Sequence, residues 1–245
     1  SSLTKLFNDI FQSETQPIQW QQSHLINLGK GKGEREKLSS KRGITLSECP
    51  AKLFEKFLFN RIIKELPFSE AQAGGRVGRG CVDQLFILKS VINQRKFDNK
   101  PTFIVFLDIE KAYDKTWVDG ILFNLWEKGI QGKIWRVIAE MNRNLTTKVK
   151  TKFGFTKPVN ITGGVRQGGI LSSPEFSSLM DRIVWDLLDL GLGISYSDAI
   201  FISVLLLMDD ITLIAENPHE LQLILNCVFS FLCRWHFTIS GTKSK

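Results

Sequence analysis

The chain has 245 residues, 43% of them hydrophobic, so it can bury a core, and we exclude a disordered or low-complexity protein. Its 32 Lys and Arg against 25 Asp and Glu give a formal net charge of +7, which permits a polyanionic partner without requiring one. No leader segment is visible and no apolar run is long enough to span a bilayer, so we expect a soluble, intracellular protein with no membrane partner, in the nucleus or the cytoplasm. The four cysteines form no Cys-x-x-Cys pair, which argues against a zinc site.

A basic segment lies near the N-terminus, where residues 28–64 hold ten Lys or Arg and four Glu. Within it, apolar residues recur at helical spacing from Pro50 to Ile62, and most of the basic residues fall elsewhere on the helical wheel. This basic face is either an ordinary solvated surface or a surface that flanks bound nucleic acid.

A helix and a strand are expected next. The helix covers residues 82–94 and presents an apolar face to the core. The core-facing residues are expected to be Leu85, Leu88 and Ile92. The apolar run Phe103–Leu107 then predicts a buried strand, which ends on an acid, Asp108.

Two further helices follow this strand. The first is expected over residues 119–128, with Asp119 as its cap and Gly129 at its end. The residues that it buries are expected to be Leu122, Leu125 and Trp126. The second is expected over residues 132–142.

The next elements are a strand and two more helices. Alternating β-branched and basic residues over 146–153 predict an exposed strand. The apolar spacing from Ser173 predicts a long helix. Its buried residues are expected to be Phe176, Leu179, Met180, Ile183 and Leu187. Asn217 and Pro218 are typical of a helix start, and this last helix is expected to run to about Arg234.

Two adjacent acids, Asp209 and Asp210, interrupt the apolar run from Phe201 to Ala215. Two strand-like segments that meet at a charged pair predict a hairpin, although a lone Asp-Asp pair is also a common solvated turn. Together with Asp108, these acids would form the oxygen-rich site that Mg²⁺ prefers. Strands interleaved with helices in this order predict an α+β fold, with an antiparallel sheet backed by helices.

Three of these segments occur in the order and approximate spacing of polymerase motifs A, B and C. They are Leu107–Asp114, Gly164–Gly168 with Pro174, and Met208–Asp210. The chain therefore resembles the reverse transcriptase domain of non-LTR (LINE-like) retrotransposons and the related group II intron enzymes.

The resemblance covers nearly the whole chain. Leu28–Gly33 and Lys41–Leu46 resemble fingers motifs, and Gln72–Cys81 is similar to a further segment of the family. This resemblance implies a right-hand polymerase with fingers over residues 1–100, a palm over residues 101–245, and no thumb.

The resemblance also implies the activity of an RNA-directed DNA polymerase, a nucleotidyltransferase that adds dNTPs to a primer 3′ hydroxyl. The implied partners are an RNA template, a DNA or RNA primer, and dNTPs. The implied cofactor is a pair of Mg²⁺ ions, with Mn²⁺ as a substitute. The thumb and accessory domains would belong to the full-length protein.

Specific residues match the family's catalytic positions. Asp108 and Asp209 would bridge the two metal ions, Asp210 would complete the site, and Ile109 would lend a backbone carbonyl. Lys243 matches the lysine that is a candidate general acid for the pyrophosphate leaving group, although it is also compatible with an ordinary surface position.

Tyr113 matches the bulky gate that collides with a ribose 2′ hydroxyl, which favours DNA synthesis. The alternative is a core aromatic residue at a helix start. The remaining matches are Lys30 and Arg42 for the triphosphate, Gln167 and Gly168 for the nucleotide and template, and Arg76 and Arg79 for template phosphates.

Two alternative functions remain open. The chain departs from the family pattern where Leu207 replaces a Tyr and Gly75 replaces a Phe. These losses are compatible with a catalytically impaired, polymerase-like scaffold that binds nucleic acid. An RNA-dependent RNA polymerase is the other alternative, and Tyr113 argues against it.

Overall fold

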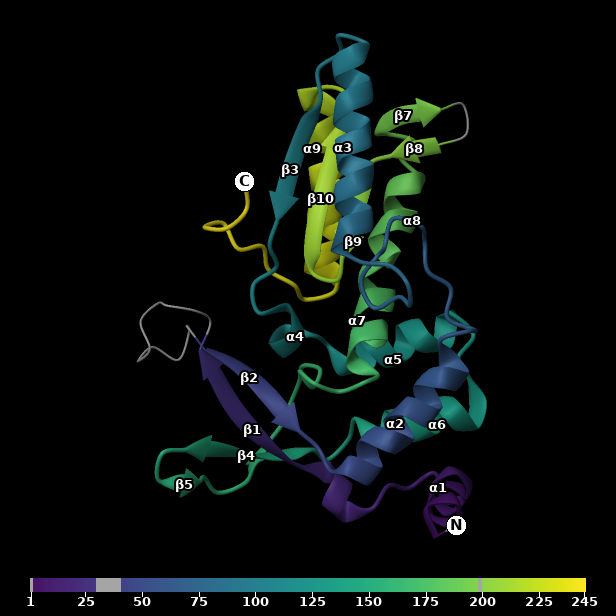
Figure 1. The fold of residues 1–245 in the computed structure, drawn as a ribbon, viewed down its shortest axis with the longest axis vertical. Helices are drawn as coiled ribbons and strands as arrows, with labels where there is room; N and C mark the ends of the chain where they lie inside the picture. The colour runs from purple at the N-terminus through teal and green to yellow at the C-terminus, as the bar shows by residue number, and fades with distance from the viewer. Residues whose placement is uncertain (1, 30–40, 198–199) are drawn as a thin grey trace. The chain divides into compact units, whose positions relative to one another are not determined.

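The computed structural model describes residues 2–29, 41–197 and 200–245, which form two compact units (Figure 1). The first unit is Ser1–Leu66 with Ile121–Ser172, and the second is Pro67–Gly120 with Ser173–Lys245. Neither unit is a continuous half of the chain. The assignment of fingers to residues 1–100 and palm to 101–245 stays a prediction.

The first unit contains a five-stranded sheet in the order β2-β1-β4-β5, with β6 also paired to β4. Its strands are β1 (Gln22–Gly29), β2 (Lys41–Leu46), β4 (Thr146–Thr151), β5 (Gly154–Phe155) and β6 (Val159–Asn160). The predicted strand at 146–153 is confirmed as β4, but it ends at Thr151 because the next two residues form the turn into β5.

Helices accompany this sheet in the first unit. They are α1 (Ser2–Ser13), the 3-10 helix η1 (Ile18–Gln21), α2 (Cys49–Ile62), α6 (Gly132–Met141) and most of α5 (Val118–Glu127). The expected helices from Pro50 and over 132–142 are confirmed. In α5, Leu122 and Leu125 are buried as expected, but Trp126 is 49% exposed and that part of the prediction is wrong. Asp119 lies inside the first turn of α5 rather than at its cap.

The second unit is built on a three-stranded antiparallel sheet in the order β3-β10-β9. Its strands are β3 (Phe103–Leu107), β9 (Val204–Leu207) and β10 (Asp210–Ala215). The predicted strand and hairpin are confirmed. Leu207 pairs with Asp210, so Met208 and Asp209 form a two-residue turn, with Met208 in the left-handed region at φ 60°.

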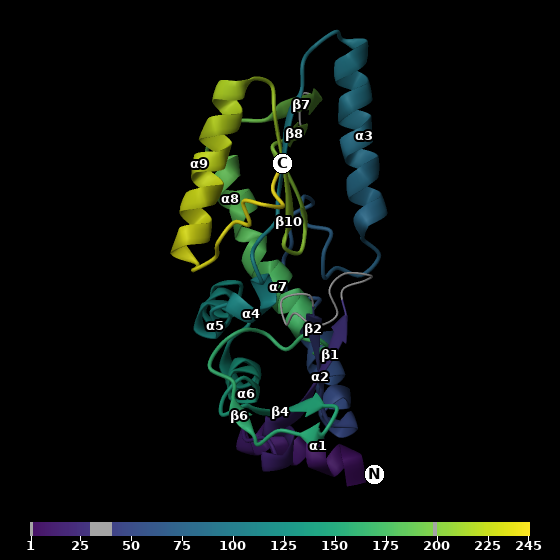
Figure 2. The same cartoon turned by 90° about the vertical axis from the view of Figure 1, so that its left-hand side faces the viewer.

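Two long helices cover opposite faces of this sheet, as Figure 2 shows. They are α3 (Cys81–Phe97) and α9 (Pro218–Arg234). The start of α9 is confirmed, because the Asn217 side chain accepts a hydrogen bond from the Glu220 backbone N–H at 2.9 Å.

The buried face of α3 agrees with the expected one only in part, because Leu88 packs against a buried cluster as expected. Gln84, Val91 and Arg95 are buried, whereas Leu85 is 59% exposed. The two polar side chains are buried with partners: Gln84 donates to the Leu206 carbonyl at 3.0 Å, and Arg95 donates to Glu216 at 2.7 Å. Hydrophobic spacing cannot anticipate a helix face that is buried through hydrogen bonds.

The long helix expected from Ser173 is two helices, α7 (Ser172–Met180) and α8 (Arg182–Leu188), separated at Asp181. The five apolar residues expected to be buried on it are all buried. Asp181 is buried as well, and its carboxylate accepts hydrogen bonds from Ser69. The remaining elements are α4 (Ala112–Lys115), β7 (Ile194–Ser197) and β8 (Ile200–Ile202). Across the described ranges, no helix has the length and apolarity needed to cross a bilayer.

Candidate active site

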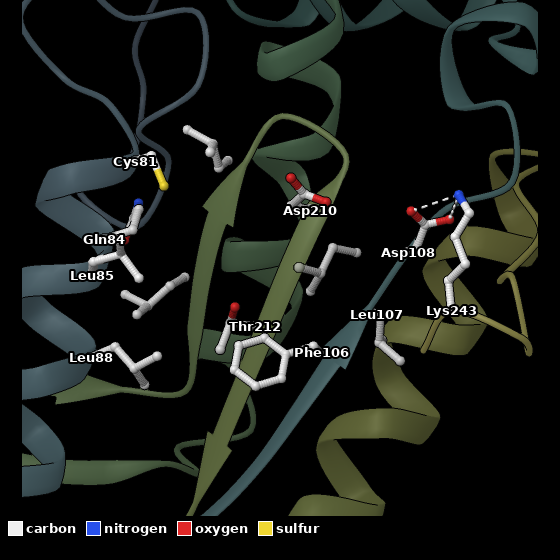
Figure 3. A pocket seen from close by; sticks show the side chains of 13 residues that line it. Cys81, Gln84, Leu85, Leu88, Phe106, Leu107, Asp108, Asp210, Thr212 and Lys243 are labelled. Carbon is white, nitrogen blue, oxygen red and sulfur yellow. Dashed lines mark hydrogen bonds and ion pairs between the residues drawn. The ribbon is translucent and has the colours of Figure 1, made fainter. Parts of the chain in front are cut away.

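A cleft of about 440 Å³ opens in the second unit at the edge of the sheet where the acids lie (Figure 3). Leu107, the last residue of β3, pairs with Ile211 on β10, so the residues beside this pair, Asp108 and Asp210, reach the same edge. Both side chains line the cleft together with Lys243. The structure therefore brings together three of the expected catalytic residues, of which Asp108 lies more than 100 residues before the other two in the sequence.

Lys243 reaches the cleft because the last residues of the chain run along β3. The Ser240 N–H donates to the Asp108 carbonyl at 2.8 Å, and Phe106 and Lys245 exchange backbone hydrogen bonds at 2.8 and 3.0 Å. From there the Lys243 ammonium donates to both carboxylate oxygens of Asp108, at 3.1 and 2.8 Å (Figure 3).

The two cleft carboxylates repel each other. Partial burial in the cleft raises the pKa of Asp210, the Asp108 carboxylate raises it further, and the Lys243 ammonium lowers it. Two oxygen donors under mutual repulsion, one already facing an ammonium group, fit a hard divalent cation such as Mg²⁺. Among the residues that the structure describes, no three His, Cys, Asp or Glu side chains gather into one metal site. A joint site with Asp209 thus stays a prediction, as does the Ile109 carbonyl.

Tyr113 lies in α4 and is half-buried. Its ring stacks on Phe176 with centroids 4.9 Å apart, and its hydroxyl lies 3.3 Å from the Ser173 Oγ. Burial raises the pKa of the Tyr113 phenol, the Ser173 hydrogen bond lowers it, and the Asp209 carboxylate raises it. This position is compatible with both the expected gate and the alternative of a packed aromatic residue.

Sequence reasoning missed Gln72, a fully buried side chain that holds the hairpin turn. The Gln72 Oε1 accepts from the N–H groups of Gly74 at 2.7 Å and Met208 at 3.2 Å, and its Nε2 donates to the Ser177 carbonyl at 3.3 Å. One amide therefore fixes the backbone next to Asp209. The only sequence signal was the Gln-Ala-Gly pattern itself.

The backbone around Gln72 lies directly against β9. The Ala73 N–H donates to the Leu206 carbonyl at 2.9 Å, and the Leu206 N–H donates to the Ala71 carbonyl at 2.8 Å. A Cβ on Gly74 would lie 2.4 Å from the Met208 nitrogen, a separation that side chains do not adopt. Glycine is therefore required where this segment crosses the turn.

Arg76 and Arg79, expected at template phosphates, both pair with Glu70. Arg76 also donates to the carbonyls of Ser69 at 2.8 Å and Gln72 at 3.1 Å, so its guanidinium helps to hold the loop. The two arginines lower the pKa of the Glu70 carboxyl, chiefly through its hydrogen bond with Arg76.

The two departures from the family pattern have different surroundings. Leu207 lines the cleft and pairs with Asp210. Gly75 has φ +69°, and a Cβ there would lie 2.8 Å from the Ser177 Oγ. A Phe at this position would be strained in the conformation that this chain adopts.

In the first unit, the expected nucleotide-binding loop lies against β2. The Thr45 N–H donates to the Gln167 carbonyl at 2.8 Å. Gly168 has φ +111°, and a Cβ on it would lie 2.9 Å from the Thr45 carbonyl oxygen, so this position also requires glycine. Arg42 is exposed on β2, and Lys30 lies outside the described residues.

A buried acid, Glu55 of α2, supports the same loop. Its side chain is 1% exposed, and its two oxygens accept from Arg166 Nη2 at 3.0 Å and from the Ile170 N–H at 2.6 Å. Sequence reasoning had assigned Glu55 no role.

We expect Glu55→Ala to lower the free energy of unfolding by about 3 kcal/mol, because it leaves a largely buried guanidinium and a backbone N–H without an acceptor. Chemical denaturation measures this change. Glu65→Ala, at an exposed acid in the turn that follows the same helix, serves as the control and is expected to change it by less than about 0.5 kcal/mol. Equal stability of the two variants would contradict the supporting role of Glu55.

A helix-backed antiparallel sheet with two neighbouring carboxylates at one end is typical of the palm of a nucleic-acid polymerase. Residues 29–245 match the family model described as "Reverse transcriptase (RNA-dependent DNA polymerase)". The chain belongs to the reverse transcriptase family.

Curated relatives from non-LTR retrotransposons are similar to it. The probable RNA-directed DNA polymerase from transposon BS of Drosophila melanogaster is 25% identical over 179 residues, which are 71% of this chain and 20% of that protein. The Pol polyprotein of the R2 element of Nasonia vitripennis is 27% identical over 223 residues, which are 90% of this chain and 21% of that protein. The chain thus spans about a fifth of the length of these relatives.

Solved telomerase structures share the fold. Apo telomerase from Candida tropicalis, truncated from its C-terminal domain, has a TM-score of 0.64 at 14% identity. The match covers 98% of this chain and 54% of the telomerase chain. Candida albicans telomerase, in complex with a TWJ fragment of telomeric RNA, has a TM-score of 0.63 at 14% identity. That match covers 98% of this chain and 45% of the telomerase chain. These likenesses place the chain in the fingers-palm fold.

Proposed function

We propose that this chain is the catalytic core of an RNA-directed DNA polymerase, which joins dNTPs to the 3′ hydroxyl of a DNA or RNA primer on an RNA template. The observation that carries the proposal is the meeting of Asp108, Asp210 and Lys243 in one cleft, in a chain of the reverse transcriptase family. A scaffold would have no physical need for two carboxylates that repel each other.

Reverse transcriptases generally use divalent metal ions, and we propose two Mg²⁺ ions, or Mn²⁺ in their place, for this chain. Asp108, Asp209, Asp210 and the Ile109 carbonyl would hold them. Bound there, such ions stabilise the negative charge that develops on the attacking and leaving oxygens during in-line phosphoryl transfer.

The Lys and Arg side chains of the chain would interact with the phosphates of the nucleotide and the template. We assign to Lys243 the proton on Nζ that the leaving pyrophosphate takes up, because this ammonium is mostly exposed and already faces the cleft. Lys30 and Arg42 are proposed to bind the triphosphate, and Gln167 and Gly168 the nucleotide and template. Arg76 and Arg79 are proposed for template phosphates, in which case the phosphates would compete with Glu70.

Primer extension tests the proposed function. The full chain is incubated with Mg²⁺ and a primer annealed to either an RNA or a DNA template, with dNTPs or rNTPs. We expect dNTP incorporation on RNA. Binding without extension would support the impaired scaffold, and extension with rNTPs alone would support an RNA-dependent RNA polymerase.

We expect Tyr113→Ala to raise the kcat/KM for ribonucleotides relative to deoxyribonucleotides by about 10–100-fold, because a small side chain leaves room for a 2′ hydroxyl. Steady-state kinetics with matched dNTP and rNTP measures this ratio. Tyr113→Phe removes the Ser173 contact but keeps the ring, so it is expected to preserve the discrimination. An unchanged ratio in the Ala variant would make Tyr113 a packing residue only.

A further inference from the structure

A buried acid, Asp181, lies at the junction of α7 and α8 in the second unit and does not line the carboxylate cleft. Its two carboxylate oxygens both accept from the Ser69 N–H, each at 3.1 Å, and the Ser69 hydroxyl donates to Oδ1. A buried carboxylate is costly to leave without donors, so this contact is strongly held. It anchors the start of the segment 69–76.

The segment 69–76 moves as one piece because an arginine closes it. Arg76 donates through Nη1 to the Ser69 carbonyl at 2.8 Å and to the Gln72 carbonyl at 3.1 Å. The Gln72 N–H also donates to the Ser69 carbonyl, at 3.3 Å. A displacement of Ser69 is therefore passed on to Gln72.

Gln72 connects this segment both to α7 and to the hairpin turn. Its Nε2 donates to the Ser177 carbonyl at 3.3 Å, and its Oε1 accepts from the Met208 N–H at 3.2 Å. Ser177 and Asp181 lie about one helical turn apart, and the Asp181 N–H donates to the Ser177 carbonyl at 2.9 Å. The segment is thus tied to the end of α7 at two points and to the hairpin turn at one.

The start of α7 holds the ring that is expected to act as the sugar gate. Tyr113 stacks on Phe176, and its hydroxyl lies 3.3 Å from the Ser173 Oγ. Both of these contact residues belong to α7. Because a helix transmits a displacement as a rigid element, the two ties at its end set the position of the hairpin turn relative to the Tyr113 ring.

We propose that Ser69 and Asp181 are positioning residues, whose contact keeps the turn that carries Asp209 in place relative to the Tyr113 ring. The role rests on the proposed function, because it concerns the rate of nucleotide addition and the choice of sugar. Neither residue lines the cleft, so both act through the backbone of the segment 69–76. A shift of about 1 Å at a catalytic group can cost about 100-fold in rate, and a partial loss of the tie is expected to cost less.

Ser69→Ala tests this role with little disturbance, because it removes the hydroxyl bond and keeps the backbone N–H donor. In single-turnover primer extension with the full chain, the rate constant is expected to fall by about 10-fold. The preference for dNTP over rNTP is expected to fall as well. The Kd for the primer-template is expected to stay within about twofold of the wild type, since no residue that binds it is changed.

Two further variants serve as controls. Ser69→Thr keeps a hydroxyl and is expected to restore most of the rate. Ser230→Ala removes an exposed hydroxyl of α9 that donates to the Asn226 carbonyl at 2.9 Å, and it is expected to extend primers like the wild type.

Two readouts separate positioning from folding. If Ser69→Ala only destabilised the chain, the amplitude of extension would fall and the remaining folded molecules would keep the wild-type rate constant. A positioning role lowers the rate constant itself. Hydrogen exchange at the Met208 amide, which bonds to Gln72, reports on the turn without any reaction, and Ser69→Ala is expected to speed it by about 10-fold.

A double variant tests whether the two residues act through one contact. Asp181→Asn removes the charge that receives both Ser69 donors, and it is expected to slow extension at least as much as Ser69→Ala. Because both changes break the same contact, their effects on the rate constant are expected not to add in the double variant. Additive losses would overturn the shared role.

The inference is also overturned if Ser69→Ala keeps the wild-type rate constant, or if Ser69→Thr is as slow as Ser69→Ala. When the wild type extends primers, either result refutes only the positioning role. A wild type that extends no primer refutes the proposed function, and exchange at the Met208 amide then decides the tie alone. Faster exchange in Ser69→Ala supports the tie, and unchanged exchange overturns it.

Discussion

Replacing Asp108 by Asn is expected to slow nucleotide addition by about 10²–10⁴-fold and to leave the fold intact. Asp108 faces the Lys243 ammonium, and its charge acts on Asp210 across the cleft. The amide keeps the size of the side chain but removes the negative charge that would hold a divalent cation. The melting temperature is expected to stay unchanged or to rise slightly, since the variant relieves a repulsion and loses only a contact with a mostly exposed lysine.

Single-turnover primer extension at saturating dNTP measures the rate, and thermal unfolding measures the stability. Glu110→Gln is the matched control, because Glu110 is an exposed acid two residues further along that pairs with Lys115 at 2.7 Å and does not line the cleft. Its rate is expected to stay within about twofold of the wild type. Near wild-type extension by Asp108→Asn would refute the catalytic assignment.

The elements that carry the acids were predictable because local pattern and fold agree there. The run Phe103–Leu107 is apolar, ends on an acid and forms β3, and the acids inside a second apolar run mark the turn between β9 and β10. The start of α9 was also predictable from the sequence, because Asn217 caps the helix and Pro218 fits its first turn without any distant partner.

The parts that escaped prediction depend on partners distant in the sequence. Gln84 and Arg95 are buried on α3 only because carbonyl groups and Glu216 receive their hydrogen bonds. The break between α7 and α8 falls at Asp181, whose buried carboxylate bonds to Ser69. No periodicity records such contacts, since all of them except the one between Arg95 and the Pro101 carbonyl join residues more than ten positions apart.

The same limit applied to the site. Sequence motifs indicated the acids and Lys243, because each stands at a recognisable position of the family. The support beneath them, Gln72 under the hairpin turn and Glu55 under the loop of Gln167, consists of buried polar side chains bonded to backbone groups. Their identity is specific only once the backbone that they bond is in place.

Gly74→Ala is expected to disturb the active site, although Gly74 is not one of the expected catalytic residues. The added Cβ would lie 2.4 Å from the Met208 nitrogen and 2.5 Å from its Cγ, so the hairpin turn must move away. That movement would stretch the hydrogen bonds that the Gln72 amide makes to Gly74 and Met208, and it would shift Asp209, which follows Met208 in the turn. A displacement of about 1 Å at a catalytic group can cost about 100-fold in rate.

We therefore expect Gly74→Ala to reduce primer extension by about 100-fold and the free energy of unfolding by about 1–3 kcal/mol. Gly80→Ala is the matched control, because Gly80 lies in the same loop and has nothing within 4 Å of the position of an added Cβ. It is expected to keep most of the activity. A Gly74→Ala variant with the wild-type rate would mean that the turn tolerates displacement, and that the geometry of the Asp209 and Asp210 carboxylates does not depend on the segment packed beneath them.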